Sequence, residues 1–328
     1  MPQKRPIAAV ILAAGEGKRM KSELPKVLHL LGGMPLVEHV YRAAAALGCE
    51  KIIVVVPPED RAVSELLDSR AVAVRQPRLL GTGDALLQSR PLLEDFDGDL
   101  VVLCGDVPLL SSSTLRQLIK VHQKQSAAAT ILTARLSNPA GYGRIVRKKG
   151  GEVARIVEEV DADLYQKALE EVNAGVYCFR APEIWGVLEK IGNRNRQGEY
   201  YLPDGIALLV DQNRPVATYE VKDVREMLGV NTRRGLALLE KIRLEKLIGR
   251  MQDEGVTVVL PEATYIEAEV EIGRDTVLYP FAFIERGARI GVNCRVGPFV
   301  SLTGDTVLED NSRVKNNVLS QNLKTTGK

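Results

Sequence analysis

The sequence predicts an α/β protein in three parts: a Rossmann-like, mostly parallel sheet with helices on both faces, a long linker helix, and a short left-handed parallel β-helix. Three observations support this. Apolar runs alternate with helical patterns in the first two-thirds, leucine and isoleucine fall at helical spacing in 232–254, and aliphatic residues recur every six positions from Leu260. The expected parts are the sheet domain at 1–231, the connecting helix at 232–255, the β-helix at 256–320 and a flexible tail at 321–328.

The sheet domain opens with an apolar run, Ile7–Ala14, which has the character of a buried strand. Further strands are expected at Ile52–Val56, Ala71–Arg75 and Leu100–Cys104, with helices at Pro35–Leu47, Glu59–Leu67, Gly83–Gln88 and Thr114–Gln125. Alternating strands and helices predict parallel strands covered on both faces. Ligands of such sheets bind beyond the carboxyl ends of the strands. Gly15 and Asp106 follow two of these strands, so we expect them to face one crevice.

The last region carries an unbroken six-residue repeat. Its aliphatic positions are Leu260, Ile266, Ile272, Leu278, Ile284, Ile290, Val296, Leu302, Leu308 and Val314. One aliphatic residue per six predicts three short strands per coil, with that residue pointing inward. The open end of such a stack needs a cap or a partner chain.

Composition excludes several classes of function. The formal net charge is +2 and aromatic residues make up 5%, so neither nucleic acid nor a membrane surface is expected as a partner. No stretch approaches the ~20 apolar residues of a membrane span. The four cysteines are scattered without metal-binding spacing, which is typical of reduced thiols in the cytoplasm.

The loop after the first expected strand carries the strongest functional pattern. Gly15 and Gly17 would let the backbone approach a ligand, with bare N–H groups available to phosphate oxygens. Arg19 and Lys26 could neutralise charge on those oxygens. The third glycine of the dinucleotide fingerprint is replaced by Met20, and the P-loop ending is absent. The pattern favours phosphate binding of another kind.

The same string, Leu-x-x-Gly-x-Gly-x-Arg-Met from Leu12 with Pro25-Lys26 after it, resembles the sugar-nucleotidyltransferases. The resemblance covers residues 7–231, and the hexapeptide repeat that follows is of the same kind as the family's repeat. It implies Mg²⁺-dependent uridylyl transfer from UTP to N-acetylglucosamine 1-phosphate, with release of pyrophosphate. Lys18 stands where the family usually carries threonine, which puts one hydroxyl contact to the triphosphate in doubt.

The resemblance also implies roles in the loop. Leu12, Ala13 and Gly15 would bind substrate. Arg19 and Lys26 would be catalytic: Arg19 would hold the triphosphate and the departing pyrophosphate, and Lys26 would bridge the two reacting phosphates. The attacking sugar phosphate is already anionic, so catalysis would rest on positioning and charge stabilisation.

A metal site is expected from two positions far apart in sequence. Asp106, in Gly-Asp-Val-Pro, suits Mg²⁺ by its chemistry but also suits a turn or a helix cap. The resemblance implies that Asp106 and Asn231 bind the metal, and that Asn231 also contacts substrate. Asn231 could instead cap the connecting helix.

Two further groups resemble the family's base and sugar pockets. Gln76, Gly81 and Thr82 would read uracil, since a glutamine amide offers both a donor and an acceptor; read alone, they form a loop entering a helix with Thr82 as its cap. Gly143, Glu158 and Asn173 would bind the sugar.

The sugar-pocket assignments carry two open points. Glu158 is adjacent to Glu159, and alone it fits a solvated carboxylate at a strand end. Ala174 replaces the family's usual threonine. The three histidines, His29, His39 and His122, are expected to be structural.

Other functions stay open. One alternative is uridylyl or thymidylyl transfer to a different sugar 1-phosphate. Another, of a different class, is a non-catalytic regulatory or assembly subunit, which would be expected to lose Arg19, Lys26 or Asp106.

The repeat raises two further expectations. Its resemblance to hexapeptide-repeat proteins implies a homotrimer through the β-helix. Family members carry a second activity, acetyl transfer, in a longer β-helix with a catalytic histidine. No histidine follows His122, so no acetyltransferase activity is expected. Whether the chain is monofunctional or a shortened form stays open.

Overall fold

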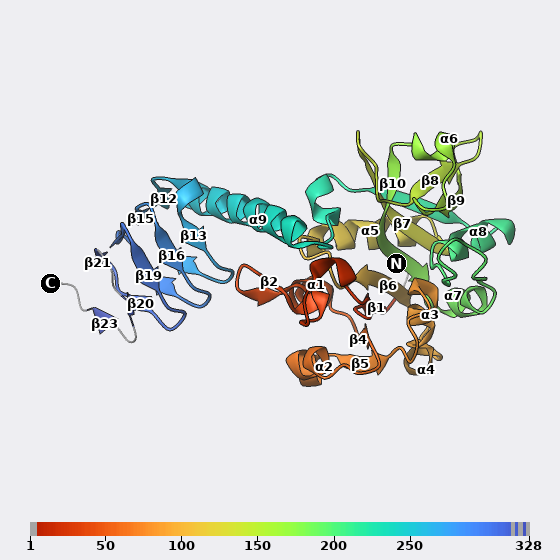
Figure 1. The fold of residues 1–328 in the computed structure, drawn as a ribbon, viewed down its shortest axis with the longest axis horizontal. Helices are drawn as coiled ribbons and strands as arrows, with labels where there is room; N and C mark the ends of the chain where they lie inside the picture. The colour runs from red at the N-terminus through yellow and green to blue at the C-terminus, as the bar shows by residue number, and fades with distance from the viewer. Residues whose placement is uncertain (1–4, 316–318, 321–323, 326–328) are drawn as a thin grey trace. The chain divides into compact units, whose positions relative to one another are not determined.

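The computed structural model describes residues 5–315, 319–320 and 324–325 (Figure 1). The chain forms two compact units. The sheet unit comprises the described residues up to His29 together with Leu36–Asn231, and the coil unit comprises Leu30–Pro35 and the described residues from Thr232 on. The segment Leu30–Pro35, which lies inside the expected first domain, therefore groups with the coil unit. No helix in the described ranges is both long and apolar enough to cross a membrane.

The sheet unit is built on a nine-stranded sheet over its described residues. Along its main path the strands are β11 (Val216–Glu220), β7 (Ala129–Arg135), β10 (Glu171–Arg180), β6 (Asp99–Cys104), β1 (Ile7–Leu12), β4 (Lys51–Val56) and β5 (Val72–Arg75). Neighbours on this path are parallel except for β10, which runs antiparallel to β6 and β7. The predicted mostly parallel sheet is confirmed. The antiparallel β10 was not anticipated.

Helices cover both faces of this sheet, as predicted. In β1, Ile7, Ala9 and Ile11 enter one hydrophobic core while Ala8 and Val10 enter the other, as the two-residue period of a strand requires. One core includes α1 (Leu36–Ala45), α2 (Ala62–Leu67) and α5 (Ser112–Lys124). The other includes α3 (Thr82–Leu87), α4 (Arg90–Leu93), α7 (Ala181–Leu188) and α8 (Asp204–Asp211).

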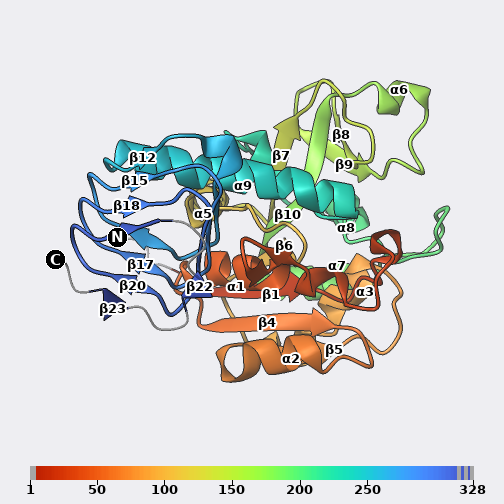
Figure 2. The same ribbon diagram turned by 60° about the vertical axis from the view of Figure 1, so that its left-hand side comes forward.

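The order of the central strands determines where a ligand can bind. β1 lies between β4 and β6, and β1 and β4 run side by side in Figure 2. Because these strands are parallel, the loops after Leu12, Val56 and Cys104 leave the sheet at the same edge. A smaller antiparallel pair, β8 (Arg144–Arg147) and β9 (Val153–Val157), joins β10 beyond this edge and precedes α6 (Leu164–Lys167).

At the opposite edge, Asp99 begins β6 as a fully buried carboxylate. Arg5 Nε lies 2.8 Å from its Oδ1, Gln123 Nε2 donates to its Oδ2 at 2.7 Å, and His122 Nε2 lies 3.5 Å away. His122 is itself buried and contacts Thr130 Oγ1 at 3.0 Å. His122 is thus part of an internal polar network, in keeping with the expected structural role.

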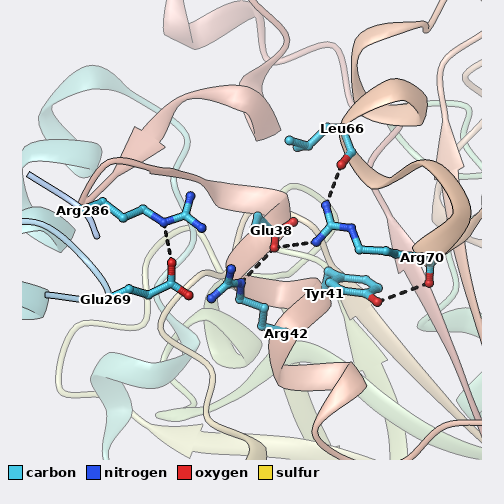
Figure 3. Close-up of polar contacts among 7 residues, drawn as sticks. All are labelled: Glu38, Tyr41, Arg42, Leu66, Arg70, Glu269 and Arg286. Atoms are coloured by element: carbon cyan, nitrogen blue, oxygen red, sulfur yellow. Dashed lines mark hydrogen bonds and ion pairs between the residues drawn. The ribbon is translucent and has the colours of Figure 1, made fainter. Parts of the chain in front are cut away.

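A second buried carboxylate, Glu38, joins α1 to the turn after α2 (Figure 3). Arg42 Nε and Arg70 Nη1 each donate to Glu38 Oε1 at 2.8 Å. The Arg70 guanidinium also lies over the Tyr41 ring, 5.1 Å from its centroid. Two cations around one carboxylate compensate its burial.

In the coil unit, the chain enters α9 (Arg233–Asp253) at Thr232, whose Oγ1 accepts from Gly235 N at 3.0 Å. Thr232, and not Asn231, is therefore the cap. The hairpin of β2 (Leu30–Leu31) and β3 (Met34–Pro35) packs against α9, since Gly32 N donates to Glu240 Oε2 at 2.8 Å. Gly32 has φ +58°, and an added Cβ would lie 2.6 Å from the Arg243 side chain, so glycine is required there.

After α9 the chain coils into three parallel sheets, each four-stranded over the described residues (Figure 1). The first sheet comprises β12 (Thr257–Val258), β15 (Val277–Leu278), β18 (Arg295–Val296) and β21 (Arg313–Val314). The second sheet comprises β13 (Tyr265–Ile266), β16 (Ala282–Ile284), β19 (Val300–Leu302) and β22 (Leu319–Ser320). The third sheet comprises β14 (Glu271–Ile272), β17 (Arg289–Ile290), β20 (Val307–Leu308) and β23 (Lys324–Thr325). This is the β-helix that the six-residue repeat predicts.

The inward residues of successive coils stack in register. Ile266, Ile284 and Leu302 form one such column, and all are fully buried. Outside the core, Glu269 and Arg286 form an ion pair (Figure 3).

The repeat differs from the expectation at both ends. Val258, not Leu260, pairs with Leu278 and is buried, because the 3₁₀ turn Pro261–Ala263 lengthens the first coil. At the other end β23 pairs with β20, within the segment expected to be a flexible tail. Residues 321–323 and 326–328 of that segment lie outside the described residues.

Candidate functional site

Two cavities lie side by side in the sheet unit at the carboxyl ends of β1, β5 and β6. The first has a volume of about 510 Å³ and the second about 430 Å³. Both are lined by Leu12, Thr82, Cys104 and Asp106. Two compartments of this size with a shared wall can hold two ligands whose reacting groups meet at that wall.

The glycine-rich loop forms one wall of the first cavity. Ala13, Gly15 and Lys26 line it, together with the shared Leu12. Gly15 has open space around its Cα, whereas Gly17 has φ +63° and a Cβ there would lie 2.6 Å from Lys26 Cβ. The conformational requirement for glycine therefore falls on Gly17, which lets the two ends of the loop pack together.

Lys26 connects the residues at the junction of the two cavities. Its Nζ forms an ion pair with Asp106 Oδ2 and donates to Asn231 Oδ1 at 3.2 Å. A carboxylate oxygen and an amide oxygen thus converge on one cationic atom. Asp106 follows β6 and Asn231 precedes α9, and the family resemblance implied that these two residues share a metal.

These donors fit Mg²⁺, which prefers oxygen ligands and retains several waters. Within the described part of the chain, no three Asp, Glu, His or Cys side chains gather as a metal site. A metal held by Asp106 and Asn231 would therefore complete its coordination with water and phosphate oxygens, as Mg²⁺ does when it binds with a nucleotide.

Two adjacent basic residues of the loop, Lys18 and Arg19, line different cavities. Lys18 lines the first cavity and pairs with Glu16 at 2.5 Å. Arg19 lines the second cavity, beside Asp106 and Asn231. The short 3₁₀ turn Lys18–Met20 separates the two side chains. Arg19, expected to hold the triphosphate, thus lines the cavity that also contains the expected sugar residues.

The first cavity is also lined by Gln76, Gly81 and Thr82. Gly81 has φ +114°, and a Cβ there would lie 2.7 Å from the Tyr200 carbonyl oxygen. Tyr200 N donates to Leu80 O at 2.7 Å, so residues 80–83 are anchored to the 198–204 segment. Thr82 is not the helix cap: its Oγ1 accepts from Leu202 N at 3.0 Å.

The second cavity is lined by the expected sugar residues Gly143, Glu158 and Asn173. Glu158 faces this cavity, whereas its neighbour Glu159 forms an ion pair with the buried Arg144, at 2.7 Å. Burial raises the pKa of Glu158, and the nearby carboxylates of Asp204, Asp161 and Glu199 raise it further. The ambiguity between the two adjacent glutamates is thereby resolved by geometry.

Asn173 is nine-tenths buried, and its side chain is held on both sides. Its Nδ2 donates to Tyr177 Oη at 2.7 Å, and its Oδ1 accepts from Gly175 N at 3.0 Å. Asn173 N also donates to Gly143 O at 2.8 Å. The register shift in β10 between Asn173 and Tyr177 creates this arrangement.

Cys104 and two tyrosines also line the cavities, and neither Cys104 nor Tyr177 was predicted from the sequence. Cys104 lines both cavities, and burial raises its pKa to about 12, so it is a thiol and not a thiolate. Tyr142 and Tyr177 line the second cavity. The signals available were the position of Cys104 two residues before Asp106 and that of Tyr142 inside Gly-Tyr-Gly-Arg.

Comparisons with known proteins agree with this geometry. Residues 9–172 match the model of the MobA-like NTP transferase domain. A crystal structure of UDP-glucose pyrophosphorylase complexed with UDP-glucose covers 74% of this chain and 99% of its own, with a TM-score of 0.60 and 18% identity. At that identity the likeness concerns the fold alone.

Curated relatives are closer in sequence. The bifunctional protein GlmU of Acetivibrio thermocellus is 43% identical over 313 residues, which is 95% of this chain and 68% of the relative. The proteins of the same name from Carboxydothermus hydrogenoformans and Halalkalibacterium halodurans are 43% and 42% identical, over 95% of this chain and 69% and 68% of their own length. At this identity over nearly its whole length, the chain belongs to the GlmU family and is a nucleotidyltransferase.

Proposed function

We propose that this protein transfers a uridylyl group from UTP to N-acetylglucosamine 1-phosphate, forming UDP-N-acetylglucosamine and pyrophosphate. The observation that carries the proposal is the meeting of Lys26, Asp106 and Asn231 where the two cavities join. One cavity begins at a glycine-rich loop suited to phosphate, and the other contains groups suited to a sugar. A phosphoryl group that passes between two such ligands would do so at this wall.

In the proposed reaction, the protein positions two anions and offsets their charge. The loop of Ala13 and Gly15 holds the triphosphate, and Lys26 lies between the two phosphates that react. The sugar phosphate oxygen attacks the α-phosphorus in line, and the bond to the β-phosphate oxygen breaks to release pyrophosphate. Arg19, which lines the second cavity together with Asp106, binds the phosphates. The nucleophile is already an anion, so no general base is required.

Mg²⁺ is the proposed cofactor, held by Asp106 and Asn231. When bound, it neutralises phosphate charge and orients the reacting groups. Lys26 forms contacts with both proposed ligands. In the nucleotide-bound protein the Lys26 ammonium group would leave Asp106 and contact phosphate, and the Asp106 carboxylate would then be free to hold the metal.

The sugar cavity favours an N-acetylated sugar over a bare one. Asn173, Glu158 and the backbone of Gly143 offer hydrogen-bond partners, while Ala174 and Leu202 add apolar surface beside them. The family's usual threonine at position 174 would add a hydroxyl there. A different sugar 1-phosphate is the main competing substrate.

A pyrophosphate-release assay on the purified protein tests the proposal. UTP, CTP, dTTP and ATP would each be paired with N-acetylglucosamine 1-phosphate, glucosamine 1-phosphate and glucose 1-phosphate, with Mg²⁺ or with EDTA. We expect the highest kcat/KM for UTP with N-acetylglucosamine 1-phosphate and no turnover in EDTA. Faster turnover of another pair would redefine the substrate. Absence of both turnover and UTP binding would favour the non-catalytic subunit.

We also propose that three chains assemble through the β-helix. Phe281 and Phe299 are more than half exposed and stack on each other with ring centroids 4.8 Å apart; Tyr265 and Phe283 form a second stacked pair at 5.2 Å. Paired aromatic side chains on a regular surface are typical of protein interfaces. Analytical ultracentrifugation would show a trimer, and Phe281→Ser with Phe299→Ser would lower the assembly state.

Acetyl transfer is not part of the proposed function. Residues 256–328 contain no histidine, whereas the family resemblance requires one for that step. Incubation of the protein with acetyl-CoA and glucosamine 1-phosphate is expected to release no coenzyme A thiol. Thiol release above the enzyme-free background would contradict this.

A further inference from the structure

We propose that Asp84 determines which nucleobase the first cavity accepts, by holding the Gln76 side-chain amide in one orientation. This inference rests on the proposed nucleotide-binding function of that cavity. Gln76 follows β5, lines the first cavity and is only 3% exposed. Asp84 lies in the first turn of α3, eight residues along the chain.

The hydrogen bonds of Gln76 identify its two amide ends. One terminal atom of the Gln76 side-chain amide lies 3.1 Å from Gly81 O and 2.7 Å from Asp84 Oδ2. A carbonyl oxygen and a carboxylate oxygen can only accept hydrogen bonds. The atom between them must therefore be the amide nitrogen, Nε2. This assignment follows from the chemistry of the partners.

The consequence concerns the other end of the amide. An amide nitrogen has two hydrogens, and Gly81 and Asp84 use both. The group left for a ligand is Oε1, which accepts only. The sequence pattern suggested that Gln76 would offer both a donor and an acceptor to a base, but the structure leaves only the acceptor.

An acceptor selects for a ring N–H. Uracil carries a hydrogen at N3, whereas cytosine has an acceptor at the same position in a ring of the same size. To bind cytosine, the Gln76 amide would have to turn over. Oε1 would then face the Gly81 carbonyl and the Asp84 carboxylate, and two hydrogen bonds would become repulsive contacts. Thymine shares the N3–H of uracil, so this contact does not separate the two.

The two acceptors are themselves held in place. Gly83 N donates to Tyr200 O at 2.8 Å and Tyr200 N to Leu80 O at 2.7 Å, which anchors the backbone on both sides of Gly81. Gln88 Nε2 contacts Asp84 Oδ1 at 3.3 Å. The Asp84 carboxylate is the only charged member of the set, so it contributes most to the preferred orientation.

Asp84→Asn is the direct test, because asparagine has the same shape but can also donate. In this variant, a turned-over Gln76 amide gains a hydrogen bond where the native protein has repulsion. We expect kcat/KM for UTP to stay within a few-fold of the native value. We expect the ratio of kcat/KM for UTP to that for CTP to fall by about tenfold or more.

Gln88→Leu is the matched control, since it removes the other partner of Asp84 and leaves the contact with Gln76. Its UTP-to-CTP ratio should equal that of the native protein. Asp84→Ala provides a second variant, and its ratio should also fall. Calorimetric titration of each folded variant with UTP and with CTP gives the same comparison without turnover.

An unchanged ratio in Asp84→Asn and Asp84→Ala, by both rates and binding, would overturn the inference and leave Asp84 a structural residue of α3. An equal loss of UTP and CTP affinity would do the same. Failure of the native protein to bind or use any nucleoside triphosphate would instead refute the proposed function. The two failures are therefore distinguishable.

Discussion

Two carboxylates in the sheet unit, one buried and one partly buried, have opposite surroundings. Asp99, at the start of β6, is surrounded by Arg5, Gln123 and His122, and although burial raises its pKa, these partners lower it overall. Glu158, in the second cavity, has a raised pKa because burial and other carboxylates act together. Among the described residues no ion pair reaches Glu158, since Arg144 pairs with Glu159. A buried charge with its own partners stabilises the fold, whereas one without them is available to a ligand.

The largest effect is expected at the junction, where the charges contact each other in the absence of ligand. Lys26→Ala or Asp106→Ala should lower turnover by at least ~10²-fold, the scale of losing one preorganised charge contact. The free energy of unfolding should change much less, because both side chains lie at the cavity wall. Rates from the pyrophosphate assay and urea denaturation would separate the two effects. Near-native turnover in either variant would remove these residues from the site.

Asp99→Asn should show the reverse of the junction variants: a loss of stability with little effect on turnover. Loss of the charge leaves Arg5 without its partner and weakens the network, so we expect unfolding to become easier by about 2 kcal/mol at neutral pH. The KM values for both substrates should be unchanged.

The pH dependence of stability follows from the lowered pKa of Asp99. The stabilisation is complete above the ordinary pKa of an aspartate and is lost as the pH falls through the lowered, folded-state value. Urea denaturation at several acidic pH values should show a shallower fall for Asp99→Asn than for the native protein. Parallel curves would contradict this assignment.

Glu158→Gln should raise the KM for the sugar phosphate by about tenfold, because a neutral amide accepts a weaker hydrogen bond than a carboxylate. The raised pKa means that native Glu158 gains a proton at a higher pH than an ordinary glutamate. The native KM should therefore rise as the pH falls through that value. The ratio of variant to native KM should shrink over the same interval, and this ratio cancels the titration of the substrates. A constant ratio would place Glu158 outside the sugar contact.

Lys18→Thr is expected to have the smallest effect. Lys18 is well exposed and pairs only with Glu16 in the described contacts, and exposed ion pairs contribute little. Restoring the family's threonine should change the KM for UTP by less than about threefold. Isothermal titration with UTP would detect a larger change, which would mean that position 18 contacts the triphosphate.

Much of the fold could be predicted because its signals are local. The run Ile7–Ala14 contains β1, the pattern at 232–254 contains α9, and the six-residue period produces the coils. The error in the first coil has a local cause as well. The turn Pro261–Ala263 shifts the inward position from Leu260 to Val258. The direction of β10 depends on strands far away in sequence, and no periodicity reports it.

The candidate site divides in the same way. The types of residue proposed to bind phosphate, metal and sugar were visible as short motifs, because turns and loops need particular residues at particular spacings. Their pairing was not visible. Lys26 and Asn231 meet across a separation of 205 residues. Which of the two adjacent glutamates faces the second cavity depends on the buried Arg144, which pairs with Glu159.

The order of strands, helices and coils, and the chemical kinds of group in the loops, thus follow from periodicity and turn chemistry in the chain alone. Only the folded protein showed which carboxylate lacks a compensating charge, which end of the Gln76 amide faces Asp84, and which oxygens converge on Lys26. Burial and hydrogen bonding depend on neighbours in space, and those neighbours come from distant parts of the sequence.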